Sequence, residues 1–432
     1  MDPRWRQRPG AAGLKPYPGS VQAMRPRSAP LAAYGTEPRF LERLALFLLA
    51  ALVFTIPWED WLIIPGLGTV SRLVGIVAIS AAVLGIVEKR TLRLPHPACA
   101  FMVAFVLWSM FSLLWTKAPN LTGIAAASNA ELLIMAWLIW ELCDCERQVL
   151  LFLQAFVLGC YVSSLDTIFE YLQGRQAAFE RYAGAGFNPN DLAILMVLSI
   201  PIAYYLSLKI PGARAWVNRV EIVLATVTIF LTGSRAASLA LIVALAIIPL
   251  TYSSLTRREK FGSVAAAIAA LAASLLFIPA SSWARLATAS SEIQQGTLND
   301  RTVIWRAALT LFENHPVLGV GAGTFAPSVQ TILGQALSAH NTFLSVLIEG
   351  GLVGFGFFLS IALILMGSSL RLPCLERSLW LVVFSAWAVG LISAAWESRK
   401  PTWFLFGICA AQIALHWSMQ HRTQRIGHLQ TA

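Results

Sequence analysis

Apolar residues in this chain gather into runs of about twenty, separated by short polar segments. A helix of that length is about 30 Å long, which matches the hydrocarbon thickness of a bilayer. The pattern therefore predicts an all-α integral membrane protein with about twelve membrane-spanning helices. Their expected bounds are 40–57, 70–87, 98–115, 121–142, 148–172, 191–209, 217–232, 235–255, 260–280, 341–368, 378–396 and 401–418.

The composition of the chain favours the same class of protein. Apolar residues make up 57% of its 432 residues and charged residues only 12%. Soluble domains average about 25% charged residues. The excess of apolar residues therefore lies in the expected spans. Because charged residues are few, their positions along the chain are informative about its topology.

Lysine and arginine residues mark every second connection between the expected spans, as they do in short cytoplasmic loops. This alternation places both termini in the cytoplasm. The net charge of +10 is therefore assigned to topology and to anionic lipids, and nucleic-acid binding is not expected. The basic residues on the cytoplasmic side are Arg4, Arg6, Arg8, Lys15, Arg25, Arg27, Arg39, Lys89, Arg90, Arg93, Arg147, Lys209, Arg214, Arg219, Arg257, Arg258, Lys260, Arg371, Arg377, Arg422 and Arg425.

Five segments follow from this topology. They are a disordered basic cytoplasmic tail (1–39), nine spans (40–280), a long external connection (281–340), three further spans (341–418) and a cytoplasmic tail (419–432). The first tail has no apolar core or small-residue cleavage site, so it does not resemble a signal peptide. Connections longer than about fifteen residues usually carry function or are disordered. The chemistry is therefore expected on the external face.

Neither a disulfide nor a metal site is expected. The cysteines fall near the cytoplasmic side or inside spans, away from an oxidising exterior. Cys143 and Cys145 lack the second Cys/His pair that a zinc site needs. On the external side, Glu59 and Asp60 form the one place where a divalent ion could bind.

The long external connection contains an amphipathic helix. Asn299 and Asp300 can cap a helix from Arg301 to about Asn314, and His315-Pro316 ends it. At helical spacing, two faces separate: Arg301, Trp305, Ala308 and Phe312 on one, and Thr302, Arg306 and Glu313 on the other. This pattern indicates a helix that lies on the bundle or the membrane surface.

Several helix starts on the external face carry polar or basic residues. Asn188-Pro189-Asn190-Asp191 caps the sixth span, Arg235 opens the eighth behind Gly233-Ser234, and His340-Asn341 opens the tenth. Helix N-termini and arginine side chains together bind anions, and a phosphate or pyrophosphate is the expected ligand. The alternative is that each arginine only anchors the membrane interface.

His340 is the candidate for proton transfer. Only two of the six histidines fall on the external side, and the other, His315, precedes a proline and ends a helix. A neutral imidazole where the long connection re-enters the membrane could take a proton from a hydroxyl. A purely structural histidine is the competing interpretation.

Three acidic residues inside expected spans are weaker candidates, because ionisable groups within a membrane are often functional. They are Glu131, Asp166 and Glu349, of which Glu349 can pair with an arginine or only line a polar seam. The glycines of Gly319-Val-Gly321-Ala-Gly323 follow no strand, so a tight turn is expected there, and a dinucleotide loop is not.

Four motifs in order resemble the bacterial O-antigen ligase and polymerase superfamily, over roughly residues 180–355. The motifs are Phe187-Asn188-Pro189-Asn190-Asp191-Leu192-Ala193, then Thr232-Gly233-Ser234-Arg235-Ala236-Ala237, then Arg301-x3-Trp305-x2-Ala308 through His315-Pro316-x2-Gly319-x-Gly321-x-Gly323-x-Phe325, and finally His340-Asn341-x-Phe343-Leu344 with Glu349-x-Gly351. The length and number of spans are most similar to the O-antigen ligases, and the fold resembles class C glycosyltransferases.

The resemblance implies an enzyme of the bacterial inner membrane with its site facing the periplasm. It implies transfer of a polysaccharide from undecaprenyl pyrophosphate to a sugar hydroxyl of lipid A–core in lipopolysaccharide biosynthesis. No metal, nucleotide sugar or other cofactor is implied.

The family's essential residues fall on particular positions of this chain. The loop histidine of the family matches His340, the arginine of its Gly-Ser-Arg motif matches Arg235, and a further loop arginine matches Arg301. Arg306 and Arg285 compete for the last role. By the resemblance, His340 is the base and the arginines hold the pyrophosphate. The residues expected to shape the substrate site are Asn188, Asn190, Asp191, Asn341 and Glu349.

Two classes of alternative remain open at the level of sequence. A polymerase or a protein O-oligosaccharyltransferase would share the chemistry and differ in the acceptor. A polysaccharide or lipid transporter would also fit about twelve spans. Many such transporters join two six-helix halves by a central cytoplasmic loop, whereas here the long connection is external and follows the ninth span.

Overall fold

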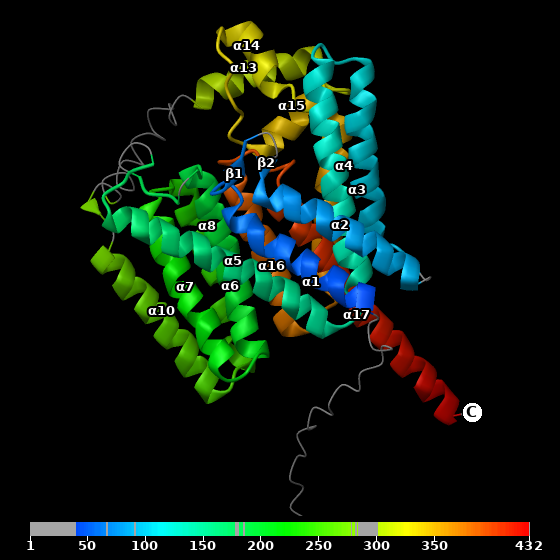
Figure 1. Cartoon of the computed structure of the whole chain (residues 1–432), viewed down its shortest axis with the longest axis vertical. Helices are drawn as coiled ribbons and strands as arrows, with labels where there is room; N and C mark the ends of the chain where they lie inside the picture. The colour runs from blue at the N-terminus through cyan, green and yellow to red at the C-terminus, as the bar shows by residue number, and fades with distance from the viewer. Residues whose placement is uncertain are drawn as a thin grey trace, which may run out of the picture. The chain divides into compact units, whose positions relative to one another are not determined.

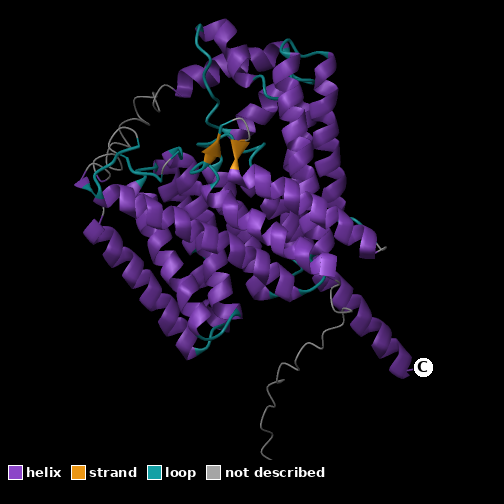
Figure 2. Cartoon of the chain, viewed as in Figure 1, coloured by secondary structure: helices purple, strands orange, loops and turns teal. Residues whose placement is uncertain are grey.

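The computed structural model describes residues 40–65, 68–89, 92–177, 181–184, 186–277, 279–280, 283 and 301–431. These residues are almost wholly helical, with one short hairpin (Figure 2). The expected basic tail, Arg285 and the expected capping pair Asn299-Asp300 lie outside the described residues.

The helices follow one another with short connections. They are α1 (Phe40–Thr55), η1 (Ile56–Trp58), α2 (Val70–Lys89), α3 (Pro97–Phe111), η2 (Ser112–Leu114), α4 (Pro119–Leu142), α5 (Glu146–Leu172), α6 (Pro189–Lys209), α7 (Ala213–Leu231), α8 (Arg235–Leu245), α9 (Ile247–Thr251), η3 (Tyr252–Ser254), α10 (Arg257–Phe277), α13 (Arg301–Asn314), α14 (Phe325–Leu333), α15 (Thr342–Ser369), α16 (Cys374–Gly390) and α17 (Lys400–Thr431). Strands β1 (Ile63–Ile64) and β2 (Gly68–Thr69) pair antiparallel between α1 and α2.

Each segment predicted to span the membrane overlaps a helix, and the eighth overlaps α8 and α9. Within the described residues, eight helical stretches are long and apolar enough to cross a membrane. They are Phe40–Trp58, Val70–Lys89, Pro97–Leu114, Pro119–Leu142, Glu146–Leu172, Pro189–Lys209, Arg235–Ser254 and Thr342–Ser369. The prediction of an all-α membrane protein is therefore confirmed in its class, while twelve crossings remain a prediction.

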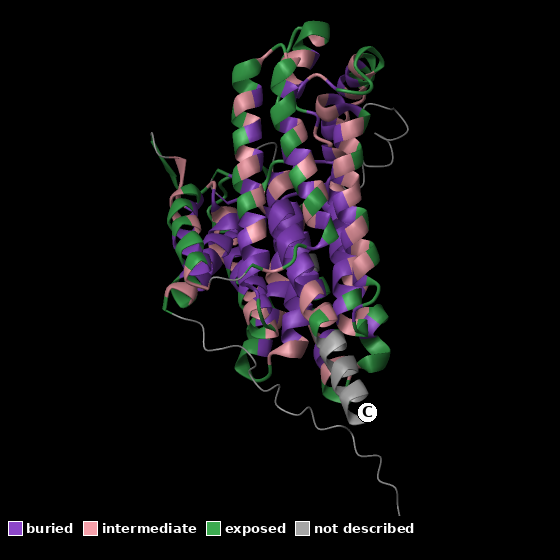
Figure 3. Cartoon of the chain, turned by 90° about the vertical axis from the view of Figure 1, so that its right-hand side faces the viewer, coloured by how far each residue is buried: buried purple, intermediate pink, exposed green. Residues whose placement is uncertain are grey.

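Helix α6 forms the centre of the bundle. It packs against α5, α7, α8 and α16, and 89% of its most apolar stretch is buried. Buried residues run through the middle of the bundle, and exposed ones cover its outer faces (Figure 3). The outer faces carry large apolar side chains such as Leu84, Leu107, Ile242 and Leu363. Apolar surface of this extent is expected where lipid replaces water.

Helix α15 is broken at Gly351, whose φ of 62° and ψ of −166° are not helical. A break in an apolar helix leaves backbone groups that must find partners, because lipid offers none. The segment after α13 supplies them. Val320 and Gly321 donate their N–H groups to the carbonyls of Ile348 and Glu349, each at 2.9 Å. The glycine-rich segment is thereby fastened inside the break.

The far side of the same break is paired as well. The N–H of Leu352 donates to the carbonyl of Pro316 at 2.9 Å, and the indole of Trp108 donates to the carbonyl of Gly350 at 2.8 Å. Gly319, Gly321 and Gly323 all have positive φ. The tight turning predicted for the three glycines is confirmed, and it brings their backbone against α15.

Helix α13 has the bounds predicted from the sequence, Arg301 to Asn314. Its inward face, including the fully buried Ala308, packs against α14 and α15 in a small apolar cluster. Figure 1 shows α13 and α14 together beyond the end of α15. The indole of Trp305 donates to the carbonyl of Ala339 at 3.1 Å, so α13 holds the residue before His340. Arg306 lies on the exposed face, as the predicted division of faces requires.

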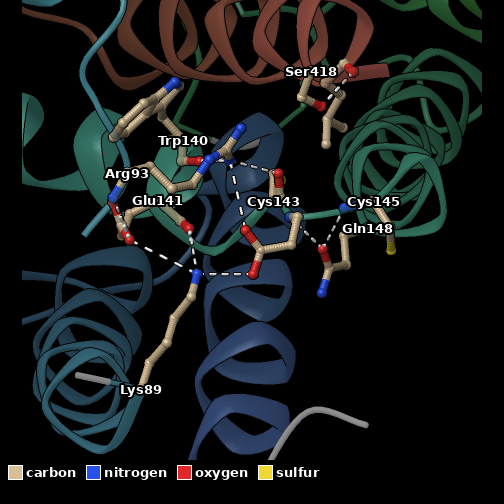
Figure 4. A network of polar contacts seen from close by, with 10 residues as sticks. Lys89, Arg93, Trp140, Glu141, Cys143, Cys145, Gln148 and Ser418 are labelled. Atoms are coloured by element: carbon tan, nitrogen blue, oxygen red, sulfur yellow. Dashed lines mark hydrogen bonds and ion pairs between the residues drawn. The ribbon is translucent and has the colours of Figure 1, made fainter. Parts of the chain in front are cut away.

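On the face assigned to the cytoplasm, Arg93 closes the end of α4 (Figure 4). Its guanidinium donates to the carbonyls of Trp140 and Cys143, each at 2.6 Å. These carbonyls lack partners within the helix, and a cation there also suits the helix dipole. Lys89 pairs with Asp144 at 2.8 Å. Arg93 and Lys89, which the sequence assigns to topology and contact with anionic lipids, therefore also bind groups of the protein itself.

Three expectations from the sequence differ from the structure. Helix α16 ends at Gly390, not near residue 396, because the following residues bond to the start of α15. Helix α17 continues to Thr431, past the expected end at residue 418. Glu131 is exposed, because α4 turns it outward, where it lies 3.9 Å from Arg72. It is therefore not the buried acid that was expected.

Candidate functional site

The site lies where the N-termini of α6, α8, α15 and α17 meet. Asn188 caps α6 by accepting the N–H of Asn190 at 2.9 Å. Asn341 caps α15 by accepting the N–H of Leu344 at 3.1 Å. Both caps were predicted, and they aim the positive ends of these helices at one region.

Helix α8 starts as the sequence predicts. Gly233 has a φ of 59° and ends α7, and Arg235 is the first residue of α8. Ser234 occupies the N-cap position, but its hydroxyl makes no capping hydrogen bond. Arg235 therefore stands in the first turn, where a cation opposes the helix dipole. An unfavourable position of this kind is expected where an anion binds.

Arg181 joins the starts of α6 and α8. Its Nε donates to the carbonyl of Thr232 at 2.6 Å, and its Nη2 donates to Oδ1 of Asn190 at 2.7 Å. The N–H of the next residue, Tyr182, donates to the carbonyl of Leu231 at 3.0 Å. These contacts explain why Asn190 belongs to the site: it positions a guanidinium between two helix ends.

The connection between α16 and α17 joins the starts of α6 and α15. The indole of Trp396 donates to Oδ1 of Asp191 at 2.7 Å, and Nη2 of Arg399 lies 3.8 Å from Oδ2 of the same carboxylate. The hydroxyl of Thr342 donates to the carbonyl of Ala394 at 2.7 Å and accepts the N–H of Trp396 at 2.8 Å. Asp191 and the first turn of α15 are thus held by the same segment.

Three of the predicted residues act on one another electrostatically. Burial and the positive charge of Arg235 lower the pKa of Arg301. Burial and the positive charge of Arg301 lower the pKa of His340, and the negative charge of Asp191 opposes them. The structure therefore brings Arg235, Arg301 and His340 into one site, from three separate elements.

His340 also has an unusual backbone. Its φ of 44° is the only positive φ of a non-glycine residue in the described part of the chain. That conformation costs about 1 kcal/mol or more and persists only where the surroundings enforce it. Here Trp305 binds the carbonyl of Ala339 on one side, and Asn341 caps α15 on the other. The backbone of His340 is thereby held between α13 and α15, and the residue is half-buried.

Glu349 does not reach toward the arginines. Its carboxylate accepts the N–H groups of Gly323 at 2.7 Å and Phe325 at 3.0 Å. It therefore caps α14 and holds the glycine-rich segment. It also lines a cavity of about 20 Å³ together with Asn129 and Glu397. In this structure Glu349 shapes the site indirectly, through the loop that it binds.

The other candidates make different contacts. Arg306 is exposed on the opposite face of α13, so Arg301 is the better placed of the two loop arginines. Glu59 pairs with Lys400 at the start of α17. The described residues contain no group of three or more His, Cys, Asp and Glu side chains placed to hold a metal ion.

Sequence reasoning missed Arg181, Trp396 and Arg399. Two of them could have been recognised from the sequence. Basic residues are usually concentrated in cytoplasmic loops, so an arginine in a connection predicted to be external is unusual. Arg181 falls between the fifth and sixth spans, and Arg399 falls between the eleventh and twelfth. Trp396 carried no such signal, since its role depends on a helix ending six residues early.

Comparison with known proteins places this site in a family segment. Residues 221–359 match the family model described as O-antigen ligase. The matched segment contains Arg235, Arg301, His340 and Glu349. No curated protein matches the sequence. The family match confirms the resemblance to the O-antigen ligase superfamily, whose members are membrane glycosyltransferase-like enzymes acting on polysaccharide and lipid substrates.

Proposed function

We propose that this chain, whose residues 221–359 match the O-antigen ligase family, is an O-antigen ligase. It would transfer a polysaccharide from undecaprenyl pyrophosphate to a sugar hydroxyl of lipid A–core. The observation that carries the proposal is the meeting of one imidazole and two guanidinium groups, from His340, Arg235 and Arg301. A base beside a cationic site is what displacement of a pyrophosphate requires.

His340 acts as the general base. Burial and the charge of Arg301 lower the pKa of His340, so its imidazole is neutral and able to accept a proton at neutral pH. It takes the proton of the acceptor hydroxyl as that oxygen bonds to the anomeric carbon of the donor. The bond from that carbon to the phosphate oxygen breaks, and its electron pair leaves with undecaprenyl pyrophosphate.

Arg235 and Arg301 hold the leaving group. The positive charge of Arg235 lowers the pKa of Arg301, so the two guanidinium groups repel each other. A pyrophosphate between them removes that repulsion and accepts paired hydrogen bonds from each planar group. Its charge grows as the sugar departs, so the same contacts strengthen in the transition state.

The proposal puts the site on the periplasmic face of the inner membrane. It is supported by the position of the site at the ends of α6, α8, α15 and α17 opposite to the connections richest in basic residues, which the sequence assigns to the cytoplasm. Both termini and the C-terminal part of α17 would then be cytoplasmic. Both lipid substrates would enter laterally between helices, in a bundle of twelve spans that resembles class C glycosyltransferases.

A reconstituted ligation tests the proposal. Purified protein is incubated with lipid-linked glycan and lipid A–core, without metal or ATP, and a ligated ladder on the acceptor is the expected product. Elongated lipid-linked glycan in place of that ladder would instead indicate a polymerase, and glycan on protein would indicate an oligosaccharyltransferase. Movement of unreacted substrate across the membrane, with no new glycosidic bond, would indicate a transporter.

Variants separate the base from the arginine clamp. His340→Ala is expected to lower the single-turnover rate by about 10²–10⁴-fold and to leave donor affinity near that of the wild type. Arg235→Ala and Arg301→Ala are expected to weaken donor binding as well as turnover, with partial rescue by Lys. Equal donor weakening in His340→Ala and Arg235→Ala would contradict this division of roles, and full activity in His340→Ala would contradict the mechanism.

A further inference from the structure

The proposed function creates an electrostatic difficulty for its base. When His340 takes a proton it becomes a cation, and it does so beside Arg301 and in a half-buried position. A base with only cations around it resists protonation and transfers protons slowly. The site therefore needs a negative charge that favours the imidazolium.

We propose that Asp191 is the positioning and charge partner of His340, and that it stabilises the imidazolium formed during transfer. This inference rests on the proposed function. Asp191 lies in the first turn of α6, and Trp396 links it to Thr342 in the first turn of α15. It belongs to the motif around Asn188, for which the sequence suggested only a role in shaping the site.

The structure holds the Asp191 carboxylate firmly. Trp396 donates to its Oδ1 at 2.7 Å, and Arg399 approaches its Oδ2 at 3.8 Å. The backbone N–H of Trp396 donates at the same time to Thr342, two residues after His340. One segment thus fixes the carboxylate and the start of the helix that carries the base.

Charged groups from several elements surround Asp191 and His340. Arg301 from α13 and Asp191 from α6 act on His340, in opposite directions. Asp191 itself faces Arg399, and its charge also reaches Asp60 in the connection after α1. Asp60 lies near the same arginine, but the charges acting on His340 are those of Arg301 and Asp191. Asp60 is therefore a matched control for removal of one negative charge.

The first test measures the proton affinity of His340 without any substrate. Diethyl pyrocarbonate reacts with neutral imidazole, so the pH dependence of modification of the His340 peptide, followed by mass spectrometry, reports its pKa. In Asp191→Asn the pKa of His340 is expected to fall, and modification at mildly acidic pH is expected to be faster than in the wild type. Asp60→Asn is expected to leave the profile unchanged. The same profile in all three proteins would overturn the proposal.

The second test measures catalysis by the folded variants. Asp191→Asn is expected to lower the single-turnover rate by about tenfold, less than the loss of the base itself, and to move the acid limb of the pH–rate profile to lower pH. Donor affinity is expected to stay close to that of the wild type. Asp191→Glu is expected to restore part of the rate, since it returns the charge on a longer side chain.

The outcomes distinguish this inference from the proposed function. If His340→Ala is inactive while Asp191→Asn keeps the wild-type rate and pH profile, the role of Asp191 is wrong and the ligase mechanism stands. If His340→Ala is fully active, the mechanism is wrong, and the modification profile still decides whether Asp191 controls the proton affinity of His340. Should Asp191→Asn fail to fold, Trp396→Phe carries the measurement, because it removes the donor that holds Oδ1 of Asp191. A carboxylate that is no longer held in place stabilises the imidazolium less, so the pKa of His340 is expected to fall in this variant too, and an unchanged profile would count against the proposal.

Discussion

The break in α15 makes a specific prediction about two glycines in one helix. Gly351 has a φ of 62° and a ψ of −166°, a region that essentially only glycine occupies. A Cβ added there would overlap the carbonyl of Val317. Gly356 lies five residues later, and a Cβ added to it would meet nothing within 4 Å. Gly351→Ala and Gly356→Ala are therefore the same chemical change in opposite settings.

The magnitude follows from what Gly351→Ala disturbs. The backbone strain alone costs about 1–3 kcal/mol. Displacing the glycine-rich segment would also weaken the bonds from Val320 to Ile348 and from Leu352 to Pro316. Each buried backbone group left without a partner costs about 1–3 kcal/mol. Gly351→Ala is thus expected to destabilise the protein by about 2 kcal/mol or more. Gly356→Ala is expected to stabilise the helix by about 0.5–1 kcal/mol.

Thermal stability in detergent measures this difference. Purified variants are heated in steps, and the fraction that remains monodisperse on size-exclusion chromatography gives an apparent Tm. Gly351→Ala is expected to have a clearly lower apparent Tm than the wild type, and Gly356→Ala an equal or higher one. Equal apparent Tm values for the two variants would refute the argument that the glycine-rich segment is fastened inside the break.

Three further predictions concern other parts of the molecule. Ligation is expected to persist in EDTA, because arginines supply the positive charge; loss of activity that Mg²⁺ or Mn²⁺ restores would contradict that role. Single cysteines at positions 292 and 428 test the topology: an impermeant thiol reagent on spheroplasts is expected to label 292, and labelling of 428 would overturn the orientation. Arg93→Ala is expected to lower the apparent Tm, since two carbonyls at the end of α4 lose their donor. Arg377→Ala, on the same predicted side of the membrane, is the control, and an equal loss of apparent Tm in both variants would refute the capping role of Arg93.

Much of the fold could be predicted because the relevant signals are local. Runs of apolar residues give the helices, and Asn188, Asn341 and Gly233 mark helix ends through their own backbone and side-chain preferences. The bounds of α13 follow from its amphipathic period and the proline after His315. Each of these features depends on a few neighbouring residues, so a single sequence contains it.

The remainder depends on contacts between distant segments. The break at Gly351 exists because residues after α13 supply its hydrogen bonds, and no periodicity within α15 signals that. The early end of α16 has the same origin, since Leu391 accepts the N–H of Thr342 at 3.0 Å. Trp396 reaches Asp191 only because of that early end. A polar residue in an apolar run could be recognised from the sequence, but its partner could not.

The distribution of arginines links the topology to the chemistry. On the cytoplasmic side as predicted, Arg93 binds backbone carbonyls and acids, so its charge is neutralised locally. On the other side, burial and the positive charge of Arg235 lower the pKa of Arg301. Arginines that only anchor the interface gain nothing from lying close to each other, because each can reach water separately. The clustering of Arg235 with Arg301, more than the presence of either, therefore favours an anion-binding site over an interfacial anchor.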